Sequence, residues 1–205
     1  FIEIRHIDLN VFKLLLWENT SSNGVPLAGA IWFLTAMFMS EMIYGVVICL
    51  IRNEFTRNII VIIIALLGMS LATYLPFRLP FAIDVGMVGV GFLHIGALLK
   101  KNKNLLLNIS LRWALGGCIL FSILGFINSN VNLRTGKYGI WPLFWINSVC
   151  LTICFWNIFR YVYEWFEKKK NLYKLQDFIL EIGKDSIVYL CLNQLIIRLK
   201  WRLIR

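Results

Sequence analysis

Long apolar runs alternate with short polar stretches along most of the chain. Residues 81–99 are apolar or small apart from one Asp and one His. As a helix rising about 1.5 Å per residue, this run would cover about 28 Å, close to the hydrocarbon thickness of a bilayer. The same pattern predicts spans over 27–51, 58–75, 105–127 and 140–159. The sequence therefore predicts an all-α fold, a polytopic membrane helix bundle of about six spans.

The end of the chain follows a less regular pattern. Two apolar runs, 175–182 and 187–197, are separated by the polar stretch Gly183-Lys184-Asp185-Ser186, and either run alone is too short to cross a bilayer. This pattern predicts a broken last helix. Irregular backbone at membrane depth is tolerated where it is buried in protein or lines a cavity, so the break is a candidate site.

Composition places the chain in the same class. Hydrophobic residues make up 59% of it, charged residues only 16%, and the mean hydropathy is +0.72, values that exclude an ordinary soluble domain. We expect one membrane domain over residues 1–205, with no room for a separate soluble domain. The net charge of +10 gathers at the ends of apolar runs, which favours membrane lipid headgroups as partners and not nucleic acid.

The loops and the first residue add three expectations. Lys and Arg are denser in the loops 52–57, 100–104 and 160–174, which predicts that these loops are cytoplasmic. Cys150 and Cys154 would share a helix face, but no His or carboxylate stands near them, so we expect no metal site. The chain begins at Phe1 without an initiator Met or a signal peptide, and we interpret it as a piece of a longer protein.

Two ionisable residues interrupt the run 81–99. Asp84 and His94 are unfavourable in lipid and are expected to face the protein interior or a wet cavity. His94 is a candidate base for an attacking hydroxyl, because imidazole titrates near neutral pH, and the alternative is a hydrogen-bonded packing residue. Asp84 is a candidate to orient a substrate or hold an Arg, or it is structural. Ten residues apart, about 15 Å along a helix, the two cannot form one catalytic pair.

The first and last predicted helices contain further candidates. Trp32 and Phe33 near the start of the run 27–51 are candidates for a substrate platform, or they are interfacial and packing residues. Glu41, the only charge in that run, is a candidate buried carboxylate that could accept a hydrogen bond from Tyr44. The 183–186 stretch offers backbone amides, an ammonium and a hydroxyl that could meet phosphate oxygens, or it is a plain turn capped by its serine.

Four segments, taken in order, resemble the acyltransferase 3 family of integral membrane acyltransferases. They are Ala30-Ile31-Trp32-Phe33-Leu34 leading to Met37-Phe38, then Leu79-Pro80-Phe81-Ala82-Ile83-Asp84 followed by Gly96, then Tyr138-Gly139 to Phe144, and Ile182-Gly183-Lys184-Asp185-Ser186. Together they cover most of the chain.

The resemblance implies a helix bundle in the bacterial cytoplasmic membrane. Members of that family transfer an acyl group, usually acetyl from cytoplasmic acetyl-CoA, to a hydroxyl of an exported sugar or cell-envelope glycan. This chain resembles only the later half of such a domain, so the missing N-terminal part would be its partner. Together with the candidates above, this gives the expected roles: catalysis by His94 and Asp84, substrate binding by Trp32, Phe33, Glu41 and Asn193, and acyl-donor binding by Gly183, Lys184 and Ser186. The family pattern itself does not require a His at position 94.

The chain departs from the family pattern in two places. The Arg and His that mark the family's first span have no counterpart here, because Arg5-His6 is not followed by an apolar span. Asn193 stands where many members have a His, and Asn cannot take a proton near neutral pH. Two other classes therefore stay open: a transporter or flippase, which also uses broken helices and intramembrane charges, and a non-catalytic membrane partner.

Overall fold

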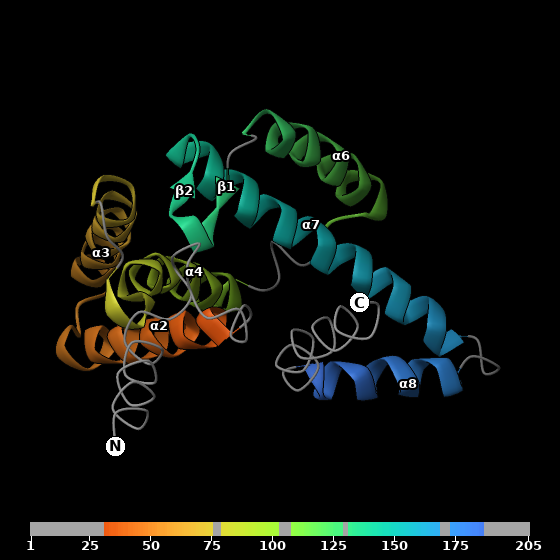
Figure 1. Ribbon diagram of the computed structural model, residues 1–205. Helices are drawn as coiled ribbons and strands as arrows, with labels where there is room; N and C mark the ends of the chain where they lie inside the picture. Colours follow the sequence, from red (N-terminus) through yellow and green to blue (C-terminus); the bar gives the residue numbers. More distant parts are fainter. Residues whose placement is uncertain (1–30, 76–78, 103–107, 129–130, 169–172, 187–205) are drawn as a thin grey trace, which may run out of the picture. The chain divides into compact units, whose positions relative to one another are not determined.

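The structure is a computed structural model that describes residues 31–75, 79–102, 108–128, 131–168 and 173–186. In these residues the chain is all-α, as predicted, with one two-stranded ribbon (Figure 1). Its elements are α2 (Ile31–Leu50), α3 (Glu54–Tyr74), η2 (Pro80–Ala82), α4 (Ile83–Lys101), α6 (Leu111–Ile127), β1 (Val131–Asn132), η3 (Leu133–Thr135), β2 (Lys137–Tyr138), α7 (Trp141–Lys168) and α8 (Tyr173–Lys184).

Four of these helices are long and apolar enough to cross a membrane. They cover Trp32–Leu50, Glu54–Tyr74, Pro80–Lys101 and Trp141–Lys168, which confirms four predicted spans, while the apolar α6 has 17 residues. Many of their large apolar side chains are exposed, as expected where the surrounding solvent is lipid. The chain is therefore a multi-pass membrane helix bundle. Residues 1–30 and the predicted apolar run 187–197 lie outside the described residues.

The chain divides into two compact units. The described part of the first holds α2, α3, α4 up to Ala97, and residues 132–137; the second holds the end of α4 together with α6, α7 and α8. The single membrane domain that the sequence predicts over residues 1–205 stays a prediction.

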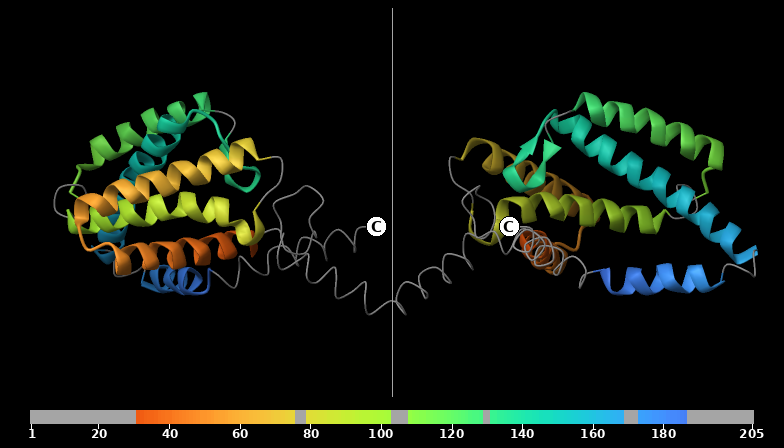
Figure 2. Two further views of the ribbon diagram at one scale, coloured as in Figure 1. Left: turned by 90° about the vertical axis from the view of Figure 1, so that its left-hand side faces the viewer. Right: turned by 45° about the vertical axis from the view of Figure 1, so that its right-hand side comes forward.

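In the first unit, α2, α3 and α4 lie side by side (Figure 2), and glycines occupy several of their contacts. A Cβ on Gly86 would lie 2.9 Å from Cβ of Met39 on α2, and one on Gly89 would collide with the hydroxyl of Ser40. A Cβ on Gly68 of α3 would lie 2.7 Å from the backbone oxygen of Asp84. Small residues let helix backbones approach closely, and Gly86 and Gly89 of α4 and Gly68 of α3 allow this here. A Cβ on Gly96, by contrast, would meet no atom within 4 Å, so Gly96 is not at such a contact.

The connections around α3 and α4 follow from local sequence. Asn53 caps α3, its Oδ1 accepting from the backbone N–H of Phe55 at 2.9 Å, which explains the tight polar turn after α2. Before α4, Pro80 occupies the first turn of η2, and Phe81 and Ala82 have φ values of 56° and 51°, in the left-handed region. This bend sets the direction in which α4 begins.

In the second unit, α6 packs along α7. A Cβ on Gly117 of α6 would lie 2.7 Å from Sγ of Cys154, and one on Gly125 would lie 2.8 Å from Nδ2 of Asn147. The predicted span 105–127 begins too early, because the described residues before Leu111 are not helical.

The late start of α6 has a tertiary cause. The backbone N–H of Ile109 donates to Oδ1 of Asn157 at 3.1 Å, and Nη1 of Arg160 donates to Oδ1 of Asn108 at 2.6 Å. Both partners project from α7. These bonds hold residues 108–109 in a non-helical conformation, so the helix starts only after them.

A compact junction joins α6 to α7. The Oδ1 atom of Asn128, a buried side chain, accepts from the N–H of Ile140 at 2.8 Å, while its Nδ2 donates to the carbonyl of Tyr138. Gly139 has φ 60°, and a Cβ there would collide with Oδ1 of Asn128. The ring of Tyr138 meets that of Phe144 edge-on. The segment from Tyr138 to Phe144, one of the four that resemble the family, therefore begins with a structural turn.

The last two described helices, α7 and α8, have bounds that differ from the predicted segments. The predicted span 140–159 and the basic stretch after it form one helix, α7, which runs 28 residues to Lys168. The helix α8 ends at Lys184, and Asp185 forms a turn, so the interruption falls inside the predicted polar break. Gly183 and Lys184 themselves are helical.

Candidate functional site

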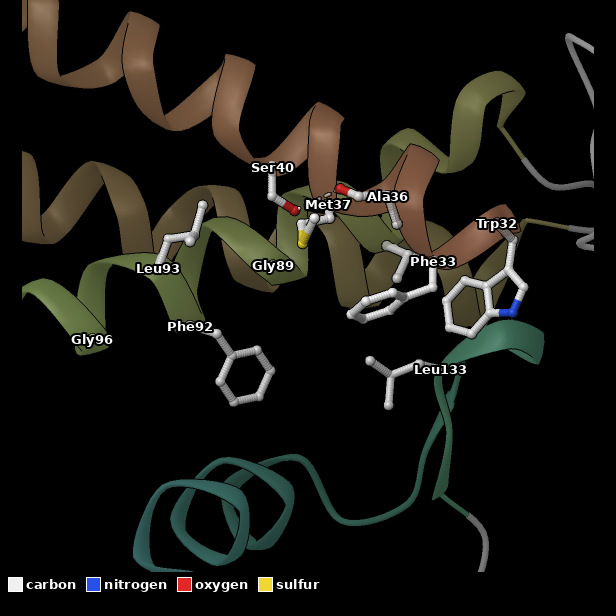
Figure 3. Close-up of a pocket in the computed structure, with 11 residues that line it drawn as sticks. Trp32, Phe33, Ala36, Met37, Ser40, Gly89, Phe92, Leu93, Gly96 and Leu133 are labelled. Carbon is white, nitrogen blue, oxygen red and sulfur yellow. Dashed lines mark hydrogen bonds between the residues drawn. The ribbon is translucent and has the colours of Figure 1, made fainter. Parts of the chain in front are cut away.

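A pocket of about 500 Å³ lies between α2 and α4 in the first unit (Figure 3), within the size range typical of small-molecule sites. It is lined by Trp32, Phe33, Ala36, Met37, Ser40, Val85, Gly89, Phe92, Leu93, Gly96 and Leu133. Two predicted substrate residues, Trp32 and Phe33, are therefore on its wall. The other wall comes from the helix that contains Asp84 and His94.

The wall of this pocket is almost entirely hydrocarbon. Among the described residues that line it, only the indole of Trp32 and the hydroxyl of Ser40 are polar side-chain groups. The Ser40 hydroxyl is shared between the carbonyl of Ala36 at 2.7 Å and that of Gly86 at 2.9 Å. Because those bonds direct it toward backbone oxygens, the pocket suits an apolar ligand.

His94 lies off the pocket, as the buried member of a polar cluster with the half-buried Tyr44 and Asn58. Its Nε2 atom lies 2.8 Å from Oδ1 of Asn58 on α3, and its Nδ1 lies 3.1 Å from the hydroxyl of Tyr44 on α2. An amide oxygen only accepts, so Nε2 donates to Oδ1 of Asn58, and in the neutral form of the ring Nδ1 would accept from the Tyr44 hydroxyl. The side chain is 5% exposed.

Both ring nitrogens of His94 therefore have partners that tie three helices together. This arrangement supports the packing alternative that the sequence left open. A role as catalytic base would need Tyr44 or Asn58 to give up its bond, and that role stays a prediction.

Asp84 occupies a second buried position, in the first turn of α4. It is 1% exposed, and its backbone oxygen lies against Gly68 of α3. A carboxylate in the first turn of a helix is favoured by the helix dipole. Neither Asp84 nor His94 lines the pocket, and the two belong to different neighbourhoods, as their spacing predicted.

Glu41 is exposed, so the prediction of a buried carboxylate is wrong. The buried face of α2 carries Ala36, Ser40 and Val47, and Glu41 lies one residue, about 100° of helical rotation, beyond Ser40. The predicted bond from Tyr44 to Glu41 is replaced by the bond from Tyr44 to His94.

The expected acyl-donor residues lie in the second unit. Gly183, Lys184 and Ser186 are exposed at the end of α8, and no atom lies within 4 Å of a Cβ placed on Gly183. Asn193 lies outside the described residues. Their binding roles stay predictions. In the part of the chain that the structure describes, no group of three or more His, Cys, Asp or Glu side chains gathers as metal ligands would.

Sequence reasoning missed two polar residues that organise the helices. Asn58 holds His94, and Asn157, which is fully buried in α7, holds the backbone before α6. Each is an amide within a mainly apolar helix, and in lipid such residues usually hydrogen-bond across helices. That signal was available in the sequence, although the identity of each partner was not.

No family model, curated protein or solved structure matches the chain. The class follows from the helices alone: this is a multi-pass membrane protein.

Proposed function

We propose that the chain is part of a membrane O-acyltransferase of the bacterial cytoplasmic membrane. It would move an acyl group, usually acetyl, from cytoplasmic acyl-CoA to a hydroxyl of an exported sugar or cell-envelope glycan. The transfer breaks the thioester C–S bond and forms an ester C–O bond, while the hydroxyl proton passes through a base to the departing CoA thiolate.

One observation carries this proposal. The segment 30–38, which resembles the acyltransferase 3 family, forms one wall of the pocket (Figure 3), and the other wall comes from α4, the helix that follows the second such segment, Leu79–Asp84, and contains its Gly96. Trp32, Phe33 and Met37 come from the first, and Gly96 comes from the second. Because the wall of this cavity is apolar, it would receive the transferred acyl group, while the sugar and the CoA phosphates would bind outside it.

The structure also supports a division of labour. Trp32 and Phe33 shape the cavity, while Asp84 and His94 lie in the helix packing behind its α4 wall. A base that reaches the acceptor hydroxyl would then come from the upstream part of the domain. Glu41 and Asn193 keep the substrate roles expected from the sequence, and Gly183, Lys184 and Ser186 keep the expected donor roles.

The test uses membranes that contain the chain within its complete gene product. Acetyl-CoA labelled in its acetyl carbon is added on the cytoplasmic side, and alkali-labile label is measured in the glycan fraction. Met37→Trp, which narrows the pocket, should lower transfer at least several-fold. Met42→Trp is the matched control, because Met42 is exposed on the same helix outside the pocket.

His94→Gln separates the two readings of His94. Glutamine can still donate and accept hydrogen bonds but cannot act as a base near neutral pH. Retained transfer would make His94 a packing residue; complete loss with normal protein levels would make it the base. No ester label from the wild-type protein would overturn the proposal, and solute uptake by proteoliposomes would then favour a transporter.

A further inference from the structure

We propose that the pocket between α2 and α4 binds the hydrocarbon chain of a membrane lipid. This inference goes beyond acyl transfer, because a lipid can occupy the pocket whether or not the protein is an enzyme. Its basis is the chemistry of the wall, the shape of the pocket and the solvent around the two helices.

The wall excludes strongly polar ligands. A sugar or a phosphate would bury hydroxyls or charges against Phe33, Met37, Phe92 and Leu93 without hydrogen-bond partners, which is unfavourable. The Ser40 hydroxyl is already bonded to two backbone carbonyls. Methylene groups need no such partners and gain from contact with this surface.

The pocket is elongated along the helices. Figure 3 shows the lining residues extending from Trp32 and Leu133 at one end, past Gly89, to Gly96 at the other. From Val85 to Gly96 is eleven residues of α4, or about 16 Å of helix. This shape fits an extended alkyl chain better than a compact ligand.

The position of the pocket indicates which ligand would bind and how it would be oriented. Both helices are of spanning length and apolar, so lipid chains surround them. Trp32 lies at the start of its span, where indole rings commonly sit at headgroup level. The lipid headgroup would therefore lie beside Trp32, and the chain would extend toward Gly96.

Gly96 leaves free space at the end of the pocket that lies away from Trp32. No atom lies within 4 Å of a Cβ placed on Gly96, so a larger side chain fits there without displacing the helices. Gly45 on α2 has the same open surroundings but does not line the pocket. The pair therefore offers a pocket-filling variant, Gly96→Leu, and a matched control, Gly45→Leu.

The test is photo-crosslinking in vesicles of phosphatidylcholine that contain a phosphatidylcholine with a diazirine in its acyl chain. Labelled residues are mapped by mass spectrometry as the probe fraction rises. Labelling of Met37, Phe92 and Leu93 should saturate and be displaced by added lipid. Labelling of Ile62 and Ile63, which are exposed on α3, should rise linearly, as for bulk lipid.

The variants decide the result. Gly96→Leu should lower saturable labelling about tenfold, since its side chain displaces about two methylene groups of the ligand. Met37→Trp, which fills the pocket from α2, should do the same, and Gly45→Leu should not. Linear labelling at the pocket, no labelling there, or no effect of either filling variant would overturn the proposal. The assay contains no CoA or acceptor, so its failure is distinct from failure of acyl transfer.

Discussion

The Nε2 atom of His94 lies 2.8 Å from Oδ1 of Asn58, which joins α4 to α3 inside the membrane-spanning part of the first unit. The Tyr44 hydroxyl extends the contact to α2 through Nδ1 of the same ring. A buried His in an apolar helix is thus a connection among three helices. In lipid, interhelical hydrogen bonds contribute about 0.6–2 kcal/mol each.

Asn58→Leu should destabilise the protein by about 1–2 kcal/mol, because it leaves the Nε2 proton of His94 without an acceptor. Thermal unfolding in detergent measures the effect. Ser70→Ala is the control, since its hydroxyl donates to the carbonyl of Leu66 in its own helix and not to another helix in the described residues.

A double-mutant cycle then tests the pair directly. Asn58→Leu and His94→Phe together should cost less than the sum of the two separate changes. Additive effects would contradict the bond between the two side chains.

Gly68→Ala should be destabilising by about 1–3 kcal/mol, because its Cβ would lie 2.7 Å from both the backbone oxygen of Asp84 and Cβ of Met87. Backbone cannot move aside as a flexible side chain does, so α3 and α4 must separate. Gly45→Ala, with no atom within 4 Å, should be neutral or slightly stabilising. Comparable melting temperatures for the two variants would show that α3 and α4 are not in close contact.

The spans were predictable from the sequence because a membrane helix needs a long run of apolar residues, which can be recognised directly. The bounds of α2, α3 and α4 lie close to those expected. Details set by tertiary contact were not predictable. The start of α6 depends on Asn157 and Arg160, which lie far along the chain.

The candidate site was predictable only in part, for the same reason. Trp32 and Phe33 do line a pocket, and Asp84 and His94 are buried, as their position in a span implied. The partners of His94 could not be read from periodicity, which gives a residue's face and not its neighbour. The prediction for Glu41 was wrong because Glu41 lies one residue beyond the buried Ser40, and that rotation of about 100° places its side chain outside the interior.

Asn157→Leu should release the backbone before α6. The change removes the acceptor for the N–H of Ile109 while keeping the size of the buried side chain. Hydrogen exchange at Ile109 should become faster, with a loss of about 1–3 kcal/mol in stability. Thr152→Val on the same helix is the control, since the hydroxyl of Thr152 donates to the carbonyl of Ser148 one turn earlier in α7. Unchanged exchange at Ile109 would contradict the proposed anchor.

Gly139→Ala should destabilise the junction between α6 and α7. Its φ of 60° disfavours any Cβ by about 1–2 kcal/mol, and the new methyl group would collide with Oδ1 of Asn128. Gly116→Ala, which meets no atom within 4 Å, is the matched control on α6. If thermal unfolding shows equal stability for these variants, the turn does not have the left-handed conformation.

The helix α8 should lie in the membrane interface. Phe178, Ile179 and Ile182 are exposed and fall on one helical face, while Asp177 and Glu181 fall on the other. Such a helix buries its apolar face among acyl chains and keeps its charges at the headgroups.

Nitroxide labels test that orientation in the full chain, reconstituted in vesicles after replacement of its five cysteines. A label at Phe178 or Ile182 should be relaxed more strongly by oxygen, which concentrates in the bilayer interior. A label at Glu181 should be relaxed more strongly by a water-soluble nickel complex. The two reagents discriminate because the faces differ in depth and not in mobility. Equal response to nickel at all three positions would place α8 in water, where its apolar face would need a protein partner instead of lipid.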